Sequence, residues 1–107
     1  MVGQSAFAAE PTSHFAQAGR AHLEEKDYDQ AILSLRQHLR LYPKDYPSWN
    51  LLATAYYFSG QPRKALRYLK FAETNAPSAL NYLYQGLCYE ALVPTRLDGS
   101  DLSLIHI

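Results

Sequence analysis

Residues 46–78, YPSWNLLATAYYFSGQPRKALRYLKFAETNAPS, decide the fold of this chain. Their aliphatic residues are all Leu or Ala, which are strong helix formers. Gly60 suits the C-terminal cap of one helix, and Pro62 suits the first position of the next. Since Pro47 is placed in the same way, the segment predicts helices over residues 47–59 and 62–75. A short connection joins these two helices, so they must lie antiparallel.

The same composition extends over the body of the chain. Leu occurs sixteen times and Ala fourteen, whereas the stretch between Glu10 and Leu92 contains no Val and a single Ile, Ile32. Sheets favour Val, Ile and Thr, so a β core would lack its usual residues, and we predict an all-α body. Its prolines and polar breaks predict five helices: Ser13 to Glu25, a second one ending at Tyr42, 47–59, 62–75, and Ala79 to Leu92.

Composition excludes several classes of function. The 107 residues include ten Lys or Arg and ten Asp or Glu, so the formal net charge is zero. Nucleic acids and anionic lipids require a cationic excess, and we expect neither as the main partner. The lone Cys88 cannot form an internal disulfide or build a zinc site by itself. No apolar run approaches the roughly 18–20 residues that span a bilayer, so no transmembrane segment is expected.

An internal repeat organises the chain. A shift of 34 residues superimposes side chains of the same size class. The aligned pairs are Phe15 with Trp49, Ala18 with Leu52, Gly19 with Ala53, His22 with Tyr56, Ala31 with Ala65, Leu35 with Leu69, His38 with Ala72, and Pro43 with Pro77. A large aromatic residue opens each unit, small residues recur inside it, and a proline ends it. Across residues 12–91 this pattern resembles the tetratricopeptide repeat family.

The resemblance divides the chain into repeat units. The first unit covers residues 12–45, the second covers 46–78, and residues 79–92 form the first helix of a third. The second unit matches the family best, whereas His22 and His38 depart from the pattern in the first. In the third unit Tyr82, Gly86 and Tyr89 come one residue earlier than strict spacing predicts.

Membership in this family implies a right-handed superhelical solenoid in which the first helices of the repeats line a concave groove. Such an array is stabilised by contacts between neighbouring repeats. Ala31 and Ala65 are expected where the two helices of one repeat cross. The other structural positions are expected at close approaches (Gly19, Ala53, Gly86) and in the gaps between repeats (Trp49, Tyr56, Tyr89).

The groove is the predicted binding site for a protein or peptide partner. The family's geometry places nine side chains there: Ala16, Arg20, Leu23, Asn50, Thr54, Tyr57, Phe58, Leu83 and Leu87. Tyr57 and Phe58 are not core positions of the repeat, and aromatic residues and Arg often anchor interfaces. The alternative is that Tyr57 and Phe58 pack against a neighbouring repeat. The carboxylate clamp of chaperone-binding relatives is not assembled, because Ala16, Arg20 and Leu51 stand at its matching positions.

No pattern predicts catalysis, a metal or a cofactor. His14, His22 and His38 have no Cys or carboxylate beside them at the spacing of zinc ligands. The chain also lacks a nucleophile turn and a glycine-rich phosphate loop. A basic stripe of Arg63, Lys64, Arg67 and Lys70 has helical spacing and admits a phosphate-binding interpretation, but we favour a solvated outer surface. We therefore expect a non-catalytic interaction module.

The two ends depart from the repeat pattern. Residues 1–11 contain Ala6-Phe7-Ala8, which resembles the cleavage site of a secretory signal peptide, and this favours export to a bacterial periplasm over a cytoplasmic location. Residues 93–107 abandon the pattern and are interpreted as an irregular, non-native tail. The helix over 79–92 is apolar nearly all round, which is typical of the interior of a longer array and favours self-association.

Two functional hypotheses follow from these patterns. In the first, the chain is an adaptor or assembly factor in an exported bacterial protein. In the second, the repeats form a non-catalytic arm that positions the catalytic or pore domain of a larger enzyme or outer-membrane secretion machine.

Overall fold

The structure, a computed structural model, describes residues 13–93, and the expectations for residues 1–11 and for the tail beyond Val93 lie outside them. Five helices follow one another: α2 (His14–Glu24), α3 (Tyr28–Leu41), α4 (Tyr46–Phe58), α5 (Pro62–Asn75) and α6 (Ala79–Leu92). No strand occurs within the described range. The all-α prediction is therefore confirmed, and each helix end that we quoted falls within about one residue of its observed place.

Short polar side chains start three of the helices. The hydroxyl of Ser13 accepts a hydrogen bond from the backbone N–H of Ala16 at 3.1 Å, and Ser78 caps α6 in the same way. Asp27 caps α3 through the N–H of Gln30 at 3.4 Å. Helix α4 ends before Gly60, whose φ of 88° lies in the left-handed region that glycine adopts freely.

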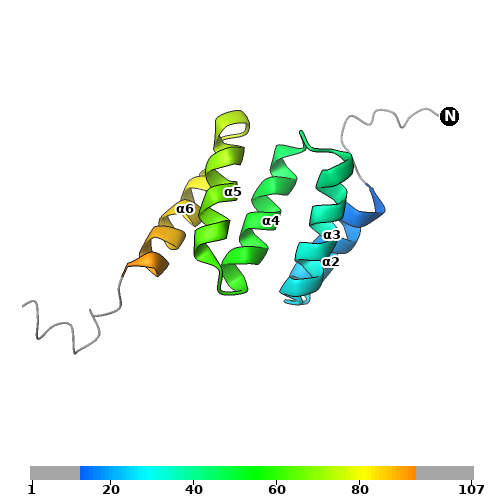
Figure 1. Cartoon of the computed structure of the whole chain (residues 1–107), viewed down its shortest axis with the longest axis horizontal. Coiled ribbons are helices and arrows are strands. Elements are labelled where there is room, and N and C mark those ends of the chain that lie inside the picture. Colours follow the sequence, from blue (N-terminus) through cyan, green and yellow to red (C-terminus); the bar gives the residue numbers. More distant parts are fainter. Residues whose placement is uncertain (1–12, 94–107) are drawn as a thin grey trace, which may run out of the picture.

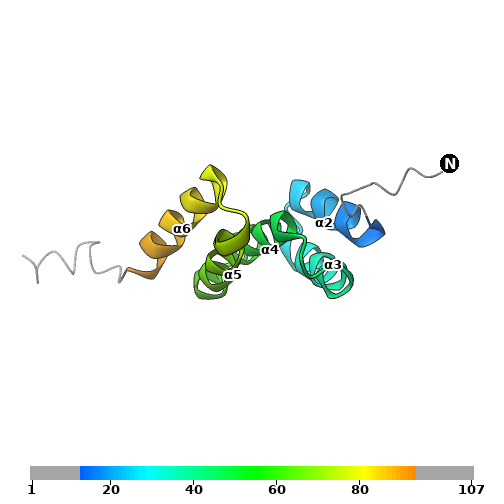
Figure 2. The same ribbon diagram turned by 90° about the horizontal axis from the view of Figure 1, so that it is seen from above.

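The helices are arranged side by side in chain order (Figure 1). Each one packs on the next, and α4 contacts both α3 and α5. Seen from above, α2 and α6 lie on one side of α4, whereas α3 and α5 lie on the other (Figure 2). Helix α4 therefore lies between a side formed by α2 and α6 and an opposite side formed by α3 and α5.

Small residues set the distances between these helices. Ala31 and Ala65 are completely buried, and Leu35 and Leu69 beside them are at most 1% exposed. A Cβ atom on Gly19 would lie 2.6 Å from Cγ of Leu35, so only glycine fits there without a shift of the neighbouring chain. The close approaches predicted at Gly19 and at the buried Ala53 are thus confirmed.

The same expectation was wrong for α6. A Cβ atom on Gly86 would meet nothing within 4 Å, and Tyr89 is 50% exposed instead of filling a gap between repeats. Within residues 13–93 no further helix follows α6 to cover these two residues, and the Tyr89 hydroxyl instead accepts a hydrogen bond from Lys70 of α5. Leu80 and Leu83 are also more than half exposed, so α6 presents an apolar outer face, as its sequence predicts.

The sequence predicts no transmembrane segment. None of the helices in residues 13–93 combines the length and apolar character that a bilayer span requires.

Candidate functional site

The predicted groove residues come from the three helices α2, α4 and α6. Figure 2 shows α2 and α6 flanking the same side of α4, so the structure brings these helices together around one surface. Arg20, Phe58 and Leu83 are exposed. The other predicted residues are half-buried or, for Ala16, buried: Leu23, Asn50, Thr54, Tyr57 and Leu87.

An aromatic cluster occupies the C-terminal end of α4. The rings of Tyr57 and Phe58 meet edge to face at 5.2 Å, and each has its centroid within about 6 Å of the Tyr84 ring from α6. Phe58 also stacks on Tyr28 of α3 at 5.4 Å. The aromatic character of Tyr57 and Phe58 is thus partly explained by contacts within the described helices, yet Phe58 remains 48% exposed.

Two predicted polar residues of the groove, Asn50 and Thr54, already have internal partners. The side-chain oxygen of Asn50 accepts a hydrogen bond from the Asn81 amide at 2.7 Å. The hydroxyl of Thr54 donates to the backbone carbonyl of Asn50 at 2.9 Å. A partner can therefore use only the remaining donors and acceptors of these side chains.

Sequence reasoning missed the network that continues from Asn81. Its amide also donates to the Leu69 carbonyl at 2.9 Å, and Gln85 donates to both Asn81 and Glu73. Asn81 is 1% exposed and Gln85 is 8% exposed, so these bonds join α4, α5 and α6 in the interior. In the sequence, the sign of this network is the pair of amide residues Asn81 and Gln85, four positions apart on a mostly apolar helix.

A second buried network surrounds His38, which is completely inaccessible to solvent. Its Nε2 lies 2.7 Å from the Asp45 carboxylate, and its Nδ1 lies 2.6 Å from the Ser13 hydroxyl. Folding brings the start of α4 against the end of α3, and this places one carboxylate beside His38 that the spacing in the sequence does not predict. In the neutral tautomer that fits, Nε2–H donates to Asp45 and the Ser13 hydroxyl donates to Nδ1.

The hydrogen bonds link Ser13, His38 and Asp45 in the order of a Ser-His-Asp catalytic triad. Their other contacts, however, show that these side chains hold the helices together. The Ser13 oxygen is already the N-cap acceptor of α2, and Asp45 additionally accepts from the Ser48 hydroxyl. The network closes the interface between the α2–α3 pair and the start of α4, with every member satisfied.

His22 also has carboxylates nearby. Its Nδ1 lies 3.9 Å from both Glu25 and Asp27, which is beyond hydrogen-bond distance, and this nitrogen is buried without a hydrogen-bond partner. Within residues 13–93, His, Cys, Asp and Glu side chains form no group of three that could hold a metal ion. Burial raises the pKa of the Cys88 thiol, which keeps it protonated and poorly nucleophilic.

The basic stripe on α5 is exposed at all four positions, Arg63, Lys64, Arg67 and Lys70. Two of its side chains contact aromatic residues. Lys64 Nζ lies 5.4 Å from the centroid of the Tyr56 ring, and Lys70 Nζ donates to the Tyr89 hydroxyl at 3.3 Å.

Antiparallel helix pairs of similar length, stacked one after another, define an α-helical repeat protein. The family described as tetratricopeptide repeat matches residues 22–72, which run from the end of α2 into α5. Helices α3 and α4, with the adjoining parts of α2 and α5, belong to the tetratricopeptide repeat family, whose members are in general non-catalytic modules for protein–protein interaction. No match was found among curated proteins or among solved structures.

Proposed function

We propose that this chain binds a helix or an extended peptide of a partner protein along the surface formed by α2, α4 and α6. The observation that carries the proposal is the exposure of Arg20, Phe58 and Leu83 on the first helix of each pair. Aromatic side chains and Arg are the residue types that most often anchor interfaces.

The chemistry of this surface favours a partner segment with apolar anchors. Leu83 is 55% exposed, and Phe58 keeps nearly half of its surface free beside Tyr57. Arg20 supplies one cation at the α2 end, where an acidic or carbonyl group of the partner would be held. An amphipathic helix or an extended strand fits such a lining.

The biological setting that we propose is an adaptor or assembly factor in the bacterial periplasm. The small-x-small pattern of Ala6-Phe7-Ala8 supports export. The second candidate is an arm that positions the catalytic or pore domain of a larger enzyme or secretion machine. It is favoured by α6, whose exposed apolar face suits a further repeat or a second copy of the chain.

Quantitative capture from a bacterial envelope extract tests the groove. Wild type, Arg20→Ala and Tyr57→Ala are immobilised at equal density, and Arg63→Ala serves as a control that removes an exposed charge from α5. We expect each groove substitution to weaken capture of the same partner about tenfold, or by about 1–2 kcal/mol, while the helix content is unchanged. The control should stay close to wild type, since exposed charges contribute little and are screened.

Tyr57 packs on Phe58 and Tyr84, so its variant also needs a stability check. Leu83→Ser is the companion variant, because Leu83 is largely exposed and is absent from the buried core. If Arg63→Ala abolishes capture and the three groove variants retain it, the groove is not the binding site.

A further inference from the structure

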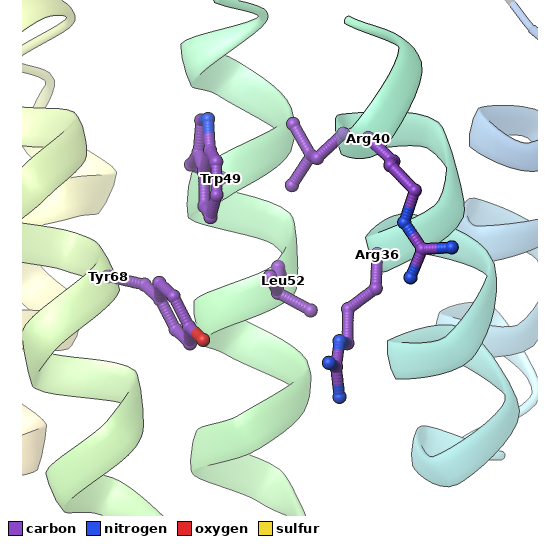
Figure 3. Close-up of a pocket in the computed structure, with 6 residues that line it drawn as sticks. Arg36, Arg40, Trp49, Leu52 and Tyr68 are labelled. Atoms are coloured by element: carbon purple, nitrogen blue, oxygen red, sulfur yellow. The ribbon is translucent and has the colours of Figure 1, made fainter. Parts of the chain in front are cut away.

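A small pocket lies on the side of the molecule opposite the proposed groove. It has a volume of about 260 Å³ and lies between α3, α4 and α5. Figure 3 shows Arg36 extending from α3 toward α4, Arg40 running along α3 above it, and Tyr68 extending toward α4 from α5. Leu39 and Leu52 supply the apolar part of the lining, and Trp49 completes it.

The pocket carries two positive charges with no internal counterion. Arg36 and Arg40 are four residues apart on one helix, so they project over the same face and repel each other. Within residues 13–93, neither guanidinium has a carboxylate at ion-pair distance. Helices α3 and α5 carry six of the ten Lys and Arg residues but only two acidic residues, although the whole chain is neutral. The charge of this side therefore favours an anion.

The opposite wall of the pocket is aromatic and well supported. The Trp49 ring stacks on Tyr68 at 5.5 Å, and Tyr68 stacks on Tyr56 at 5.4 Å. The indole N–H of Trp49 donates to the carbonyl of Pro43 at 2.8 Å, which fixes the orientation of the ring. Burial and the neighbouring Tyr68 raise the pKa of Tyr56, whereas the positive charge of Arg36 lowers it.

The size of the pocket limits its occupant. Its volume is just below the range of about 300–1,000 Å³ that holds drug-sized ligands, so one aromatic side chain with a neighbouring acidic group fills it better than a nucleotide would. An aromatic ring can stack beside Trp49 while a carboxylate is held by the planar guanidinium groups. We propose that this pocket is a second docking site, which takes an aromatic residue followed by an acidic residue in a peptide segment of a partner protein.

Trp49 is the only tryptophan of the chain, so its fluorescence reports on this pocket directly. The probe is the capped tetrapeptide Gly-Phe-Glu-Gly, titrated into the full chain at low salt. Matched probes replace Glu by Gln or Phe by Ala, and phenylacetate presents the same chemistry as a free small molecule. We expect saturable quenching by the first peptide and binding at least about fivefold weaker for each altered peptide.

Variants of the chain test the role of the arginines. Arg36→Gln and Arg40→Gln should each weaken binding of the first peptide about fivefold to tenfold, whereas Arg63→Gln, which removes a charge from α5 outside the pocket, should change it less than twofold. Arg36→Lys keeps the charge but loses the planar fork, so it should recover only part of the affinity. Raising the salt concentration from about 20 to about 500 mM should weaken binding in wild type far more than in Arg36→Gln.

Three outcomes would overturn the proposal. One is the absence of saturable quenching by the Phe-Glu peptide, and another is equal binding of the Glu and Gln peptides. The third is binding of phenylacetate as tight as that of the peptide, which would assign the pocket to a free aromatic acid. Both arginines are exposed, so their replacement should leave thermal unfolding unchanged and the binding data interpretable.

Discussion

The α2–α3 pair and the α4–α5 pair share one packing scheme but fill one equivalent buried position differently. Ala31 with Leu35 in the first pair and Ala65 with Leu69 in the second are all at most 1% exposed. At the next buried turn the second pair has Ala72, whereas the first pair has His38, and both are completely buried. An imidazole can replace a methyl group there only because Ser13 and Asp45 satisfy both of its ring nitrogens.

The repeat pattern therefore determines which positions are buried, but it does not determine which hydrogen-bond partners a polar residue at such a position has. In the second pair, the polar link to the following helix comes from Asn81, which bonds Asn50 and the backbone of Leu69. In the first pair, the link to α4 comes from His38 and Asp45. Each interface between pairs therefore contains one buried polar connection, built from unrelated side chains.

Substitutions at the shared positions should give the largest effect and should be equal in the two pairs. Ala31→Leu and Ala65→Leu each add three carbon atoms at a completely buried crossing of helices, which forces the backbone apart. We expect a loss of about 2–3 kcal/mol in the free energy of unfolding for each variant, measured by urea denaturation. Ala21→Leu at an exposed position of α2 is the control and should stay within about 0.5 kcal/mol. Wild-type stability of both core variants would contradict their assignment to helix crossings.

The next prediction breaks the polar connection of the first pair. His38→Ala leaves the carboxylate of Asp45 without its ring N–H donor and opens a cavity, so we expect a loss of about 1–3 kcal/mol. His14→Ala removes an imidazole from an exposed site on α2 and should be nearly neutral. Thermal unfolding at pH 7 compares the two variants. Equal stability of both would show that the buried network contributes nothing.

A matched pair of glycines sharpens the comparison with α6. Gly19 and Gly86 hold corresponding positions in the first and third units, but only Gly19 has a neighbouring helix against it. Gly19→Ala should cost about 1–2 kcal/mol, because the new methyl group meets Leu35. Gly86→Ala enters open space in a helix interior and should instead stabilise by about 0.5–1 kcal/mol. Chemical denaturation of the two variants should therefore shift in opposite directions.

The positions of the helices could be predicted from sequence because they depend on local signals. Leu and Ala content, Ser13 and Ser78 as caps, and Pro62 after Gly60 act over a few residues, and all of them are visible in one sequence. The close approach at Gly19 followed from the repeat pattern, since the same position recurs as Ala53. The expectation for Gly86 failed because a repeat position is packed only where a following helix covers it.

The site was less predictable, because its chemistry depends on residues distant in sequence. The bonds of His38 with Ser13 and of Asn50 with Asn81 join residues 25 and 31 positions apart, and no local pattern marks either pair. The same reason hid the pocket lined by Arg36 and Trp49. Helical spacing revealed the regular stripe on α5, whereas the two arginines one turn apart on α3 form too short a pattern to stand out in the sequence.

The smallest effect concerns the turns that end the first helix of each pair. Lys26 and Gly60 are equivalent under the 34-residue shift, and both adopt a positive φ, of 63° and 88°. Glycine reaches this region without strain, whereas a side chain is disfavoured there by its Cβ atom. Gly60→Ala should therefore destabilise by about 1 kcal/mol, while Lys26→Gly should be neutral or stabilise by a few tenths, since relief of strain is partly offset by the entropy of the unfolded chain. Urea denaturation at one pH resolves this difference in sign. A loss of stability in Lys26→Gly as large as that in Gly60→Ala would mean that Lys26 makes contacts that outweigh its backbone strain, and the two turns would then not be equivalent.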